Sequence, residues 1–319
     1  MNLRQLKALC EVIDHGLSIS SASQSLYRTQ PSITRQIQEL EKELGLDLFI
    51  RQRNRLLDVT PQGREIVAIA RRMLDDASNI QRLSDELSQV AAGEFSIATT
   101  HTQARYVLPR VIRTFMGEHP KVKLNLRQGT PAQCHYLVAQ GKADIAICTE
   151  TQEPPEDVVV IPCYGLSRSV VTPPDHPLLS ARSLTLAAIA RYPVITYDEG
   201  FSARSIVDKA FVDSGITPNV VLSAIDADVS KAYVEMGLGI AILATIAFDP
   251  KRDINLRRVD AKRLFPPSTL GIVVRRNNYL RGYMLDFMRL FAPALKKLDI
   301  RKAVSGRGAV APKGPLPAL

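Results

Sequence analysis

One segment constrains the architecture of this 319-residue chain more than any other: residues 64–90 contain neither glycine nor proline. Apolar side chains recur through the segment at the spacing of one helical face, among them Ile66, Met73 and Ile80. We predict one long amphipathic helix that ends where Gly93 follows two alanines. Its apolar stripe is too long for a solvated linker, so residues 61–93 are expected to form a linker and dimerisation helix with a hinge.

Three shorter helices are predicted in front of this segment, around residues 3–13, 19–26 and 30–44. Pro31 suits the first turn of the third helix and Gly45 suits its C-terminal stop. Small side chains in the second helix would let the third helix cross it closely, as a helix-turn-helix requires. The third helix directs one apolar stripe to the core, formed by Ile33, Ile37, Leu40 and Leu44.

The opposite face of the third helix carries side chains that can bond base edges and phosphates. Acidic residues in its C-terminal half would repel phosphate, so only the N-terminal half is expected to approach DNA. Two extended runs then flank residues 52–55 and predict a hairpin wing with alternating arginines. Residues 1–60 are therefore predicted to form a winged helix-turn-helix DNA-binding domain, against the alternative of a helical oligomerisation domain. The predicted DNA-binding residues are Arg28, Gln30, Pro31, Ser32, Thr34, Arg35, Gln38, Arg51, Arg53 and Arg55.

Net charge does not locate this DNA-binding site. The chain carries a net charge of +9, but residues 1–90 hold 12 basic and 12 acidic side chains. The excess lies in residues 251–319, with 16 basic and 4 acidic side chains. The residue pattern, rather than the overall charge, thus carries the prediction of DNA binding.

Strand-like and helical segments alternate from residue 94 to about residue 300, which predicts an α/β domain with a mainly parallel sheet. Residues 301–319 are rich in glycine and proline and are expected to form a disordered tail. No apolar run is long enough to span a membrane, and the N-terminus does not resemble a signal peptide, so a cytoplasmic protein is expected. The four cysteines show no metal-ligand spacing, so we expect buried, reduced thiols and neither a metal nor a cofactor.

Several stretches of the chain resemble a known family. QPSITRQIQELEKELGLDLFIR and VTPQGRE are similar to the N-terminal domain of LysR-type transcriptional regulators, and TPPDHPL and EMGLGIAIL resemble motifs found across that family. IATTHTQARY, ITYDEGFSARS, IDADVSKAYV and RRNNYLRGYMLDFMRLFAPAL resemble the CysB group, regulators of sulfur assimilation. The resemblance runs to about residue 300. It implies an effector-binding domain of the periplasmic-binding-protein type over residues 94–300. Lobe I is expected near 94–162 and 268–300, and lobe II near 163–267.

Two strand ends followed by helix starts predict a ligand cleft between these lobes. Hydroxyl and amide side chains at helix starts suit a small anion without any Lys or Arg, although they also serve as ordinary helix caps. Asp226 and Asp228 are expected to be such caps. In the CysB group, matching positions hold sulfate-like anions or related effectors. The resemblance therefore implies effector-binding roles for Thr100, Thr102, Gln103, Thr149 and Ser202, the last being a position where Thr is commoner.

The expected function is that of a CysB-like, DNA-binding transcription regulator of sulfur-assimilation genes. Its expected partners are double-stranded operator DNA, a small anionic sulfur metabolite or O-acetylserine-like effector, RNA polymerase, and further copies of itself in a dimer of dimers. The alternative is a solute-binding receptor for sulfate or an organosulfur compound, which would not need the first 93 residues. His101 has no identifiable Ser or Cys partner with an orienting acid, so we do not expect an enzyme.

Overall fold

The computed structural model describes residues 1–53, 55–87, 93–306 and 315–319. The chain divides into two compact units, Met1–Gln89 and Val90–Leu319. No helix among the described residues is long and apolar enough to cross a membrane.

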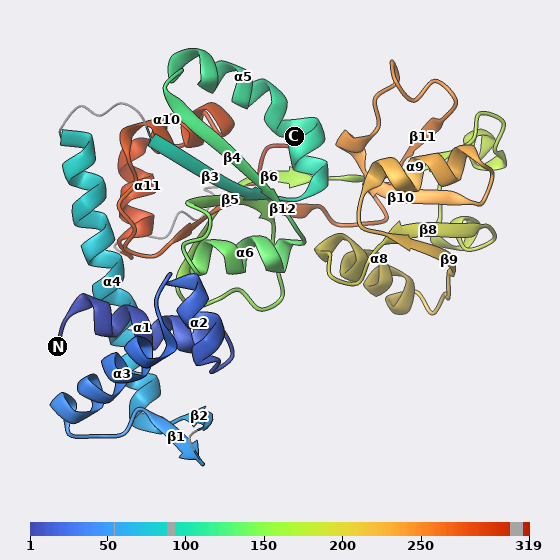
Figure 1. The fold of residues 1–319 in the computed structure, drawn as a ribbon. Helices are drawn as coiled ribbons and strands as arrows, with labels where there is room; N and C mark the ends of the chain where they lie inside the picture. The colour runs from blue at the N-terminus through green and yellow to red at the C-terminus, as the bar shows by residue number, and fades with distance from the viewer. Residues whose placement is uncertain (54, 88–92, 307–314) are drawn as a thin grey trace. The chain divides into compact units, whose positions relative to one another are not determined.

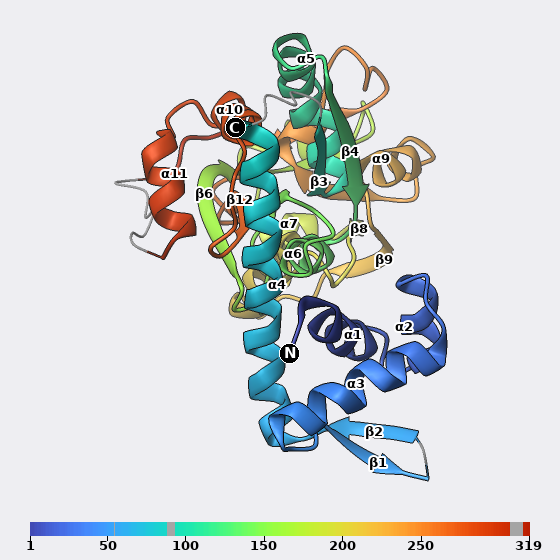
Figure 2. The same cartoon turned by 60° about the vertical axis from the view of Figure 1, so that its left-hand side comes forward.

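The first unit is a helix-turn-helix with a two-stranded wing and a long helix (Figure 2). An Asn2–Gln5 capping box begins the first helix, and Gly45, at φ 70°, ends the third in the left-handed conformation that glycine tolerates best. A side chain at Gly63 would bring a Cβ atom to 2.4 Å from the Leu48 carbonyl oxygen, so the start of the long helix needs a glycine there. The elements are α1 (Leu3–Asp14), α2 (Ile19–Ser25), α3 (Gln30–Leu44), β1 (Phe49–Gln52), β2 (Arg55–Val59) and α4 (Pro61–Leu87).

Helix α4 divides its apolar side chains between two environments. Val67 and Ala70 are buried in the core of the first unit with residues of α1 and α3. Along the rest of the helix, Ile69, Met73, Ile80 and Leu83 remain exposed, and Ile80 is 70% exposed. The first unit therefore covers only part of the stripe. The predicted break at 91–92 lies outside the described residues.

The second unit contains two five-stranded sheets, ordered β4-β3-β5-β12-β6 in lobe I and β11-β7-β10-β8-β9 in lobe II (Figure 1). In each sheet two pairings are parallel and two are antiparallel. The prediction of a mainly parallel sheet is therefore wrong, because β6, β7, β11 and β12 run against their neighbours. The strands are β3 (Gly93–Thr99), β4 (Val122–Gln128), β5 (Ile145–Thr149), β6 (Val158–Leu166), β7 (Arg168–Thr172), β8 (Pro193–Tyr197), β9 (Asn219–Ala224), β10 (Ile240–Ala244), β11 (Arg257–Asp260) and β12 (Ser268–Arg275).

Helices cover both faces of each sheet, so successive strand residues enter different cores. In lobe I, Ile97 packs beneath α5 and α10, whereas Ala98 packs against α6. In lobe II, Val170 and Val171 divide in the same way between the α8 side and the α9 side. The helices are η1 (Gln103–Val107, a π-helix), α5 (Leu108–Glu118), α6 (Pro131–Ala139), η2 (Pro177–Ser180), α7 (Leu186–Ile189), α8 (Ser202–Asp213), α9 (Ala227–Glu235), η3 (Thr245–Ala247), α10 (Gly282–Phe291) and α11 (Lys297–Val304).

Two predicted boundaries differ from the structure. Strand β6 stays in the lobe I sheet as far as Leu166, four residues beyond the expected limit of residue 162. The disordered tail predicted from residue 301 is wrong for residues 301–304, which belong to α11 and bury Ala303 and Val304. The Gly165 N–H also donates to the Pro317 carbonyl at 2.9 Å, so part of the terminal segment pairs with β6. Residues 307–314 of that predicted tail lie outside the described residues.

Candidate DNA-binding surface and effector cleft

The polar face of α3 is exposed along its N-terminal half. Ile33, Ile37 and Leu40 are buried in the core, whereas Gln30, Pro31, Arg35 and Gln38 are exposed, and Ser32 and Thr34 are partly exposed. Arg35 Nε donates to Glu39 Oε1 at 2.7 Å across one helical turn. Burial of one stripe thus turns the predicted recognition side chains outward together.

Arg51, at the base of the wing, is engaged within the protein. Its guanidinium makes two hydrogen bonds to the buried Glu41 carboxylate, at 2.6 and 3.1 Å, and the Leu48 N–H donates to the same carboxylate at 2.8 Å. A bidentate pair of this kind fixes the orientation of both side chains and also stabilises their opposite charges. Arg51 therefore holds the wing against α3, and Glu41, which was expected to repel phosphate, is neutralised.

The other predicted basic residues lie on exposed turns. Arg53 and Arg55 are exposed near the tip of the wing, and Arg28 is exposed in the turn before α3. Tyr27, at the same turn, has φ 52° and is almost fully exposed. Sequence reasoning did not select Tyr27 as a DNA contact, although an aromatic residue at a helix-turn-helix turn is a usable signal.

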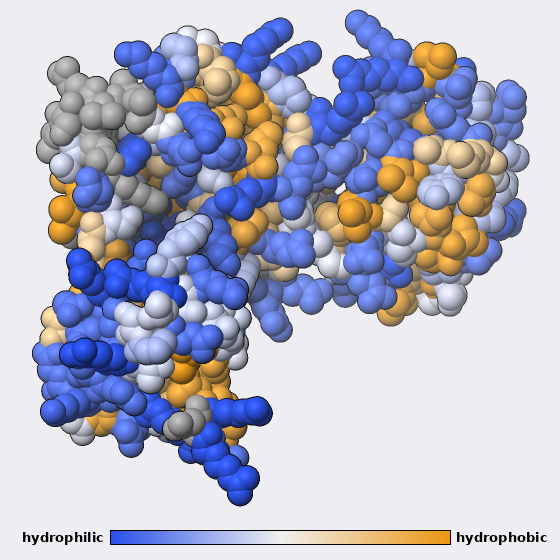
Figure 3. Space-filling view, viewed as in Figure 1, coloured by the Kyte–Doolittle hydropathy of each residue, from blue (hydrophilic) through white to orange (hydrophobic). Residues whose placement is uncertain are grey.

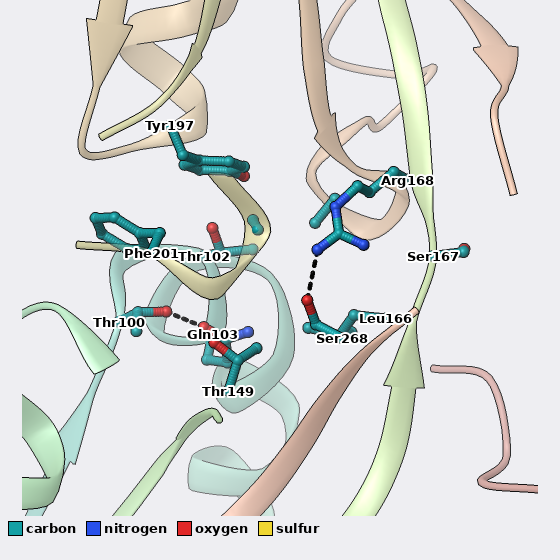
Figure 4. A pocket seen from close by; sticks show the side chains of 12 residues that line it. Thr100, Thr102, Gln103, Thr149, Leu166, Ser167, Arg168, Tyr197, Phe201 and Ser268 are labelled. Carbon is teal, nitrogen blue, oxygen red and sulfur yellow. Dashed lines mark hydrogen bonds between the residues drawn. The ribbon is translucent and has the colours of Figure 1, made fainter. Parts of the chain in front are cut away.

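A small cavity of about 40 Å³, partly open to solvent, forms a cleft between the two lobes. Four of the five predicted effector-binding residues line it: Thr100, Thr102, Gln103 and Thr149 (Figure 4). Thr100, Thr102 and Gln103 follow the end of β3, and Thr149 is the last residue of β5, the adjacent parallel strand. The Thr100 hydroxyl donates to Gln103 Oε1. Gln103 begins the π-helix η1, an irregularity found frequently at functional sites.

Ser202, the fifth predicted residue, does not line the cleft but supports it. It is the first residue of α8 in lobe II, and its hydroxyl donates to Thr149 Oγ1 of lobe I at 3.0 Å. A hydroxyl at position 202 therefore joins the two lobes at the edge of the cleft. Thr149 ends β5, so this contact joins the start of α8 to a strand end and not to Thr100, Thr102 or Gln103.

The expectation of a cleft without a cation is wrong. Arg168, the first residue of β7, lines the cleft, and its guanidinium donates to the Pro266 carbonyl at 2.6 Å and to Ser268 Oγ at 2.5 Å. Burial lowers the pKa of Arg168 to about 10, and the nearby Glu150 carboxylate partly opposes this. An arginine within an otherwise buried strand, SRSVVT, was the available sequence signal.

Aromatic side chains form another wall of the cleft. The rings of Tyr197 and Phe201 are stacked, with centroids 5.6 Å apart. The Tyr197 hydroxyl is buried without a hydrogen-bond partner in the described part of the chain, and burial raises the pKa of this phenol. Leu166, Ala203 and Ala244 extend the apolar lining.

A second polar cluster joins the lobes beside the cleft. Tyr106, in η1 of lobe I, donates to Asp228 of lobe II at 2.5 Å and accepts from Lys231 Nζ at 2.8 Å. Lys231 also bonds Asp253 and the Ala247 carbonyl, at 2.9 and 3.0 Å. Burial alone would lower the pKa of Lys231, but its hydrogen bonds outweigh burial and raise it. Asp226 caps α9 as expected, whereas Asp228 belongs to this cluster instead.

Two family descriptions match the chain. "Bacterial regulatory helix-turn-helix protein, lysR family" matches residues 3–64, and "LysR substrate binding domain" matches residues 88–296. The transcriptional regulator SsuR of Burkholderia cenocepacia is 43% identical over 94% of this chain and 97% of its own length. CysB of Haemophilus influenzae is 41% identical over 95% of this chain and 94% of its own length. The chain belongs to the LysR family.

A solved structure supports the same conclusion for the second unit. The cofactor-binding domain of the Cbl transcriptional regulator is 40% identical and superimposes with a TM-score of 0.64, covering 67% of this chain and 94% of that domain. The predicted arrangement of a helix-turn-helix domain followed by a two-lobed α/β effector-binding domain is therefore confirmed. The prediction of a CysB-like, LysR-type DNA-binding regulator rather than an enzyme is confirmed as well. The alternative of a solute-binding receptor fails, because residues 3–64 match the helix-turn-helix family.

Proposed function

We propose that this LysR-family regulator controls sulfur-assimilation genes, in the cytoplasm, in response to a small anionic effector. The effector is a sulfur metabolite such as sulfate or adenosine phosphosulfate, or a carboxylate-bearing precursor such as O-acetylserine. The observation that carries the proposal is the convergence of Thr100, Thr102, Gln103 and Thr149 on one cleft. Their hydroxyl and amide groups supply hydrogen-bond donors for an anion that must also leave as its concentration falls.

Operator DNA is proposed to bind at the exposed face of α3 and at the wing. Arg35, Gln30 and Thr34 would contact base edges in the major groove, while Arg53 and Arg55 follow the backbone or enter a minor groove. Pro31, Ser32, Gln38 and Arg28 border the same surface. Arg51 is proposed to position the wing against α3 through its pair with Glu41. RNA polymerase is the proposed partner of the DNA-bound regulator.

A homo-oligomer, a dimer of dimers, is proposed to present several recognition helices to adjacent half-sites. Its support is the exposed apolar stripe of α4, which includes Met73 and Ile80. Apolar residues also gather on the viewer's side of lobe II (Figure 3). Exposed apolar residues of lobe II include Val212, Val221, Ile225, Met236 and Leu238. Met73→Asp or Ile80→Asp places a charge in the apolar stripe of α4 and should dissociate the oligomer. Sedimentation that shows a monomeric wild type would contradict the proposal.

The decisive experiment measures DNA binding and effector binding on the same protein. Gel-shift assays on DNA upstream of sulfur-assimilation genes should show a complex that competitor DNA of random sequence does not remove. Calorimetry should show that sulfate, adenosine phosphosulfate or O-acetylserine binds with a dissociation constant of about 1 µM to 1 mM. The proposed effector role fails if none of these compounds binds.

A further inference from the structure

The wall of the effector cleft contains a buried arginine that makes no ion pair with any residue the structure describes. Arg168 is only 3% exposed, and the two groups that accept from its guanidinium, the Pro266 carbonyl and Ser268 Oγ, are both neutral. Among the residues that the structure describes, no carboxylate oxygen lies within 4.0 Å of this guanidinium. Its Nε is buried and has no hydrogen-bond partner. The guanidinium thus retains an unused N–H donor, and its charge is only partly offset by the more distant Glu150 carboxylate.

A buried charge in this condition costs free energy, which an anion in the cleft would recover. With a pKa of about 10, Arg168 still carries its charge at neutral pH. Arginine is also suited to the task because its planar donors match a carboxylate or another oxyanion. The missing partner is therefore expected to be an anionic group of a ligand.

The cleft has two separate polar regions. Arg168 and Ser268 begin the strands at which the chain crosses between the lobes, β7 and β12. Figure 4 shows the guanidinium across the cavity from the cluster of Thr100, Gln103 and Thr149. Hydrogen-bond donors and acceptors thus face the ligand from two directions.

Apolar side chains occupy the lining around these two polar regions. Leu166, Phe201, Ala203 and Ala244 all line the cleft. A free sulfate ion carries charged oxygen on every side and would leave some of it unpaired against these groups, at a cost. A molecule with a carbon body and a polar group at each end matches this distribution.

We propose that Arg168 binds the carboxylate or sulfonate group of a small organic effector whose other polar end lies against Thr100, Gln103 and Thr149. This inference rests on the proposed function of the same cleft and narrows its ligand from any small anion to an organic oxyanion. Arg168 is then the residue that selects for the charge of the effector, and the threonines select for its uncharged polar end.

Calorimetry on the full-length protein with matched probes tests this inference. The probes are ethanesulfonate with its neutral analogue ethanesulfonamide, O-acetyl-L-serine with its methyl ester, and inorganic sulfate. The wild type should bind at least one of the two organic acids roughly 10- to 100-fold more tightly than the analogue that lacks its acid group. Arg168→Gln should remove that preference. Arg257→Gln is the matched control, because Arg257 also bonds main-chain carbonyls in lobe II but does not line the cleft.

A second variant keeps the test valid if Arg168→Gln does not fold, as judged by circular dichroism. Ser268→Ala removes a neutral acceptor of the guanidinium and keeps the charge, so the preference for the anion should persist or increase. The inference would be overturned if Ser268→Ala lost the preference for the acid over its analogue, or if a folded Arg168→Gln kept that preference. Tighter binding of sulfate than of both organic acids would also overturn it. If the organic anions bind but do not depend on Arg168, only this inference fails. If no probe binds to the wild type, the proposed effector function of the cleft fails as well.

Discussion

The two units of the chain hold ion pairs of nearly equal length in opposite surroundings. In the first unit Arg35 lies 2.7 Å from Glu39, and its side chain is 80% exposed. In the second unit Lys231 lies 2.9 Å from Asp253, and both side chains are 9% exposed. An exposed pair contributes about 0–1 kcal/mol, so Arg35 can exchange Glu39 for DNA at little cost. Separating the buried pair would leave an unpaired charge inside the protein at a much larger cost in free energy, so this pair stabilises the fold.

The largest effect is expected when the buried pair is broken. Lys231→Met leaves Asp253 buried beside Asp228 without their shared cation, which should lower the free energy of unfolding by about 3–5 kcal/mol. The chain has no tryptophan, and eight of its nine tyrosines follow residue 90, so tyrosine fluorescence in urea reports on the second unit. Lys209→Met is the control, since its pair with Asp213 is exposed. Equal losses in the free energy of unfolding for the two variants would show that the buried pair is no more stabilising than the exposed one.

Removing hydroxyl groups from the cleft should impair effector binding without weakening DNA binding in the absence of effector. Thr100→Val and Thr102→Val preserve the shape of the side chain, and each ligand atom left unpaired should cost about 1–3 kcal/mol. Calorimetry with the effector found for the wild type measures the loss. Thr114→Val is the control, because the Thr114 hydroxyl donates to the Arg110 carbonyl within α5 and does not line the cleft. A double variant that binds as tightly as the wild type would place the effector elsewhere.

Truncating exposed side chains of α3 should weaken the recognition of operator DNA without affecting the folding of the first unit. Arg35→Ala and Thr34→Ala should each reduce discrimination between operator and random DNA by about 1–3 kcal/mol, because each contact to a base edge carries a share of the specificity. Gel shifts with both DNAs measure the ratio of affinities, and Lys42→Ala in the last turn of α3 is the control. If both variants discriminate between operator and random DNA as well as the wild type does, the recognition surface does not lie on this half of the helix.

The same contrast explains which features could be predicted from the sequence. The faces of α3 follow from a local period of 3.6 residues, so Ile33 and Arg35 could be assigned to opposite sides without a structure. Thr100 and Gln103 belong to one contiguous motif. The partners of Arg168 and Tyr106 could not be predicted, since Arg168 and Ser268 are 100 residues apart in the sequence, and Tyr106 and Asp228 are 122 apart.

Two wrong predictions have similar physical causes. Strand direction depends on the path of the chain between lobes, which strand and helix periodicity does not encode. The start of the expected tail folds because Ala303 and Val304 can be buried against lobe I, a contact that local composition does not reveal. Local pattern therefore predicted the exposed DNA-binding unit better than the buried cleft.

The smallest expected effect lies within α3, where two glutamates of one helix differ in burial. Glu39→Gln removes only an exposed partner of Arg35, so the free energy of unfolding should change by less than about 0.5 kcal/mol. DNA affinity should rise slightly, because one negative charge near the phosphates is lost. Glu41→Gln should instead cost about 1–3 kcal/mol, because the buried carboxylate accepts from both Arg51 and the Leu48 N–H. Urea unfolding followed by far-ultraviolet circular dichroism compares the two variants. A larger loss for Glu39→Gln than for Glu41→Gln would show that exposure does not set the strength of these pairs.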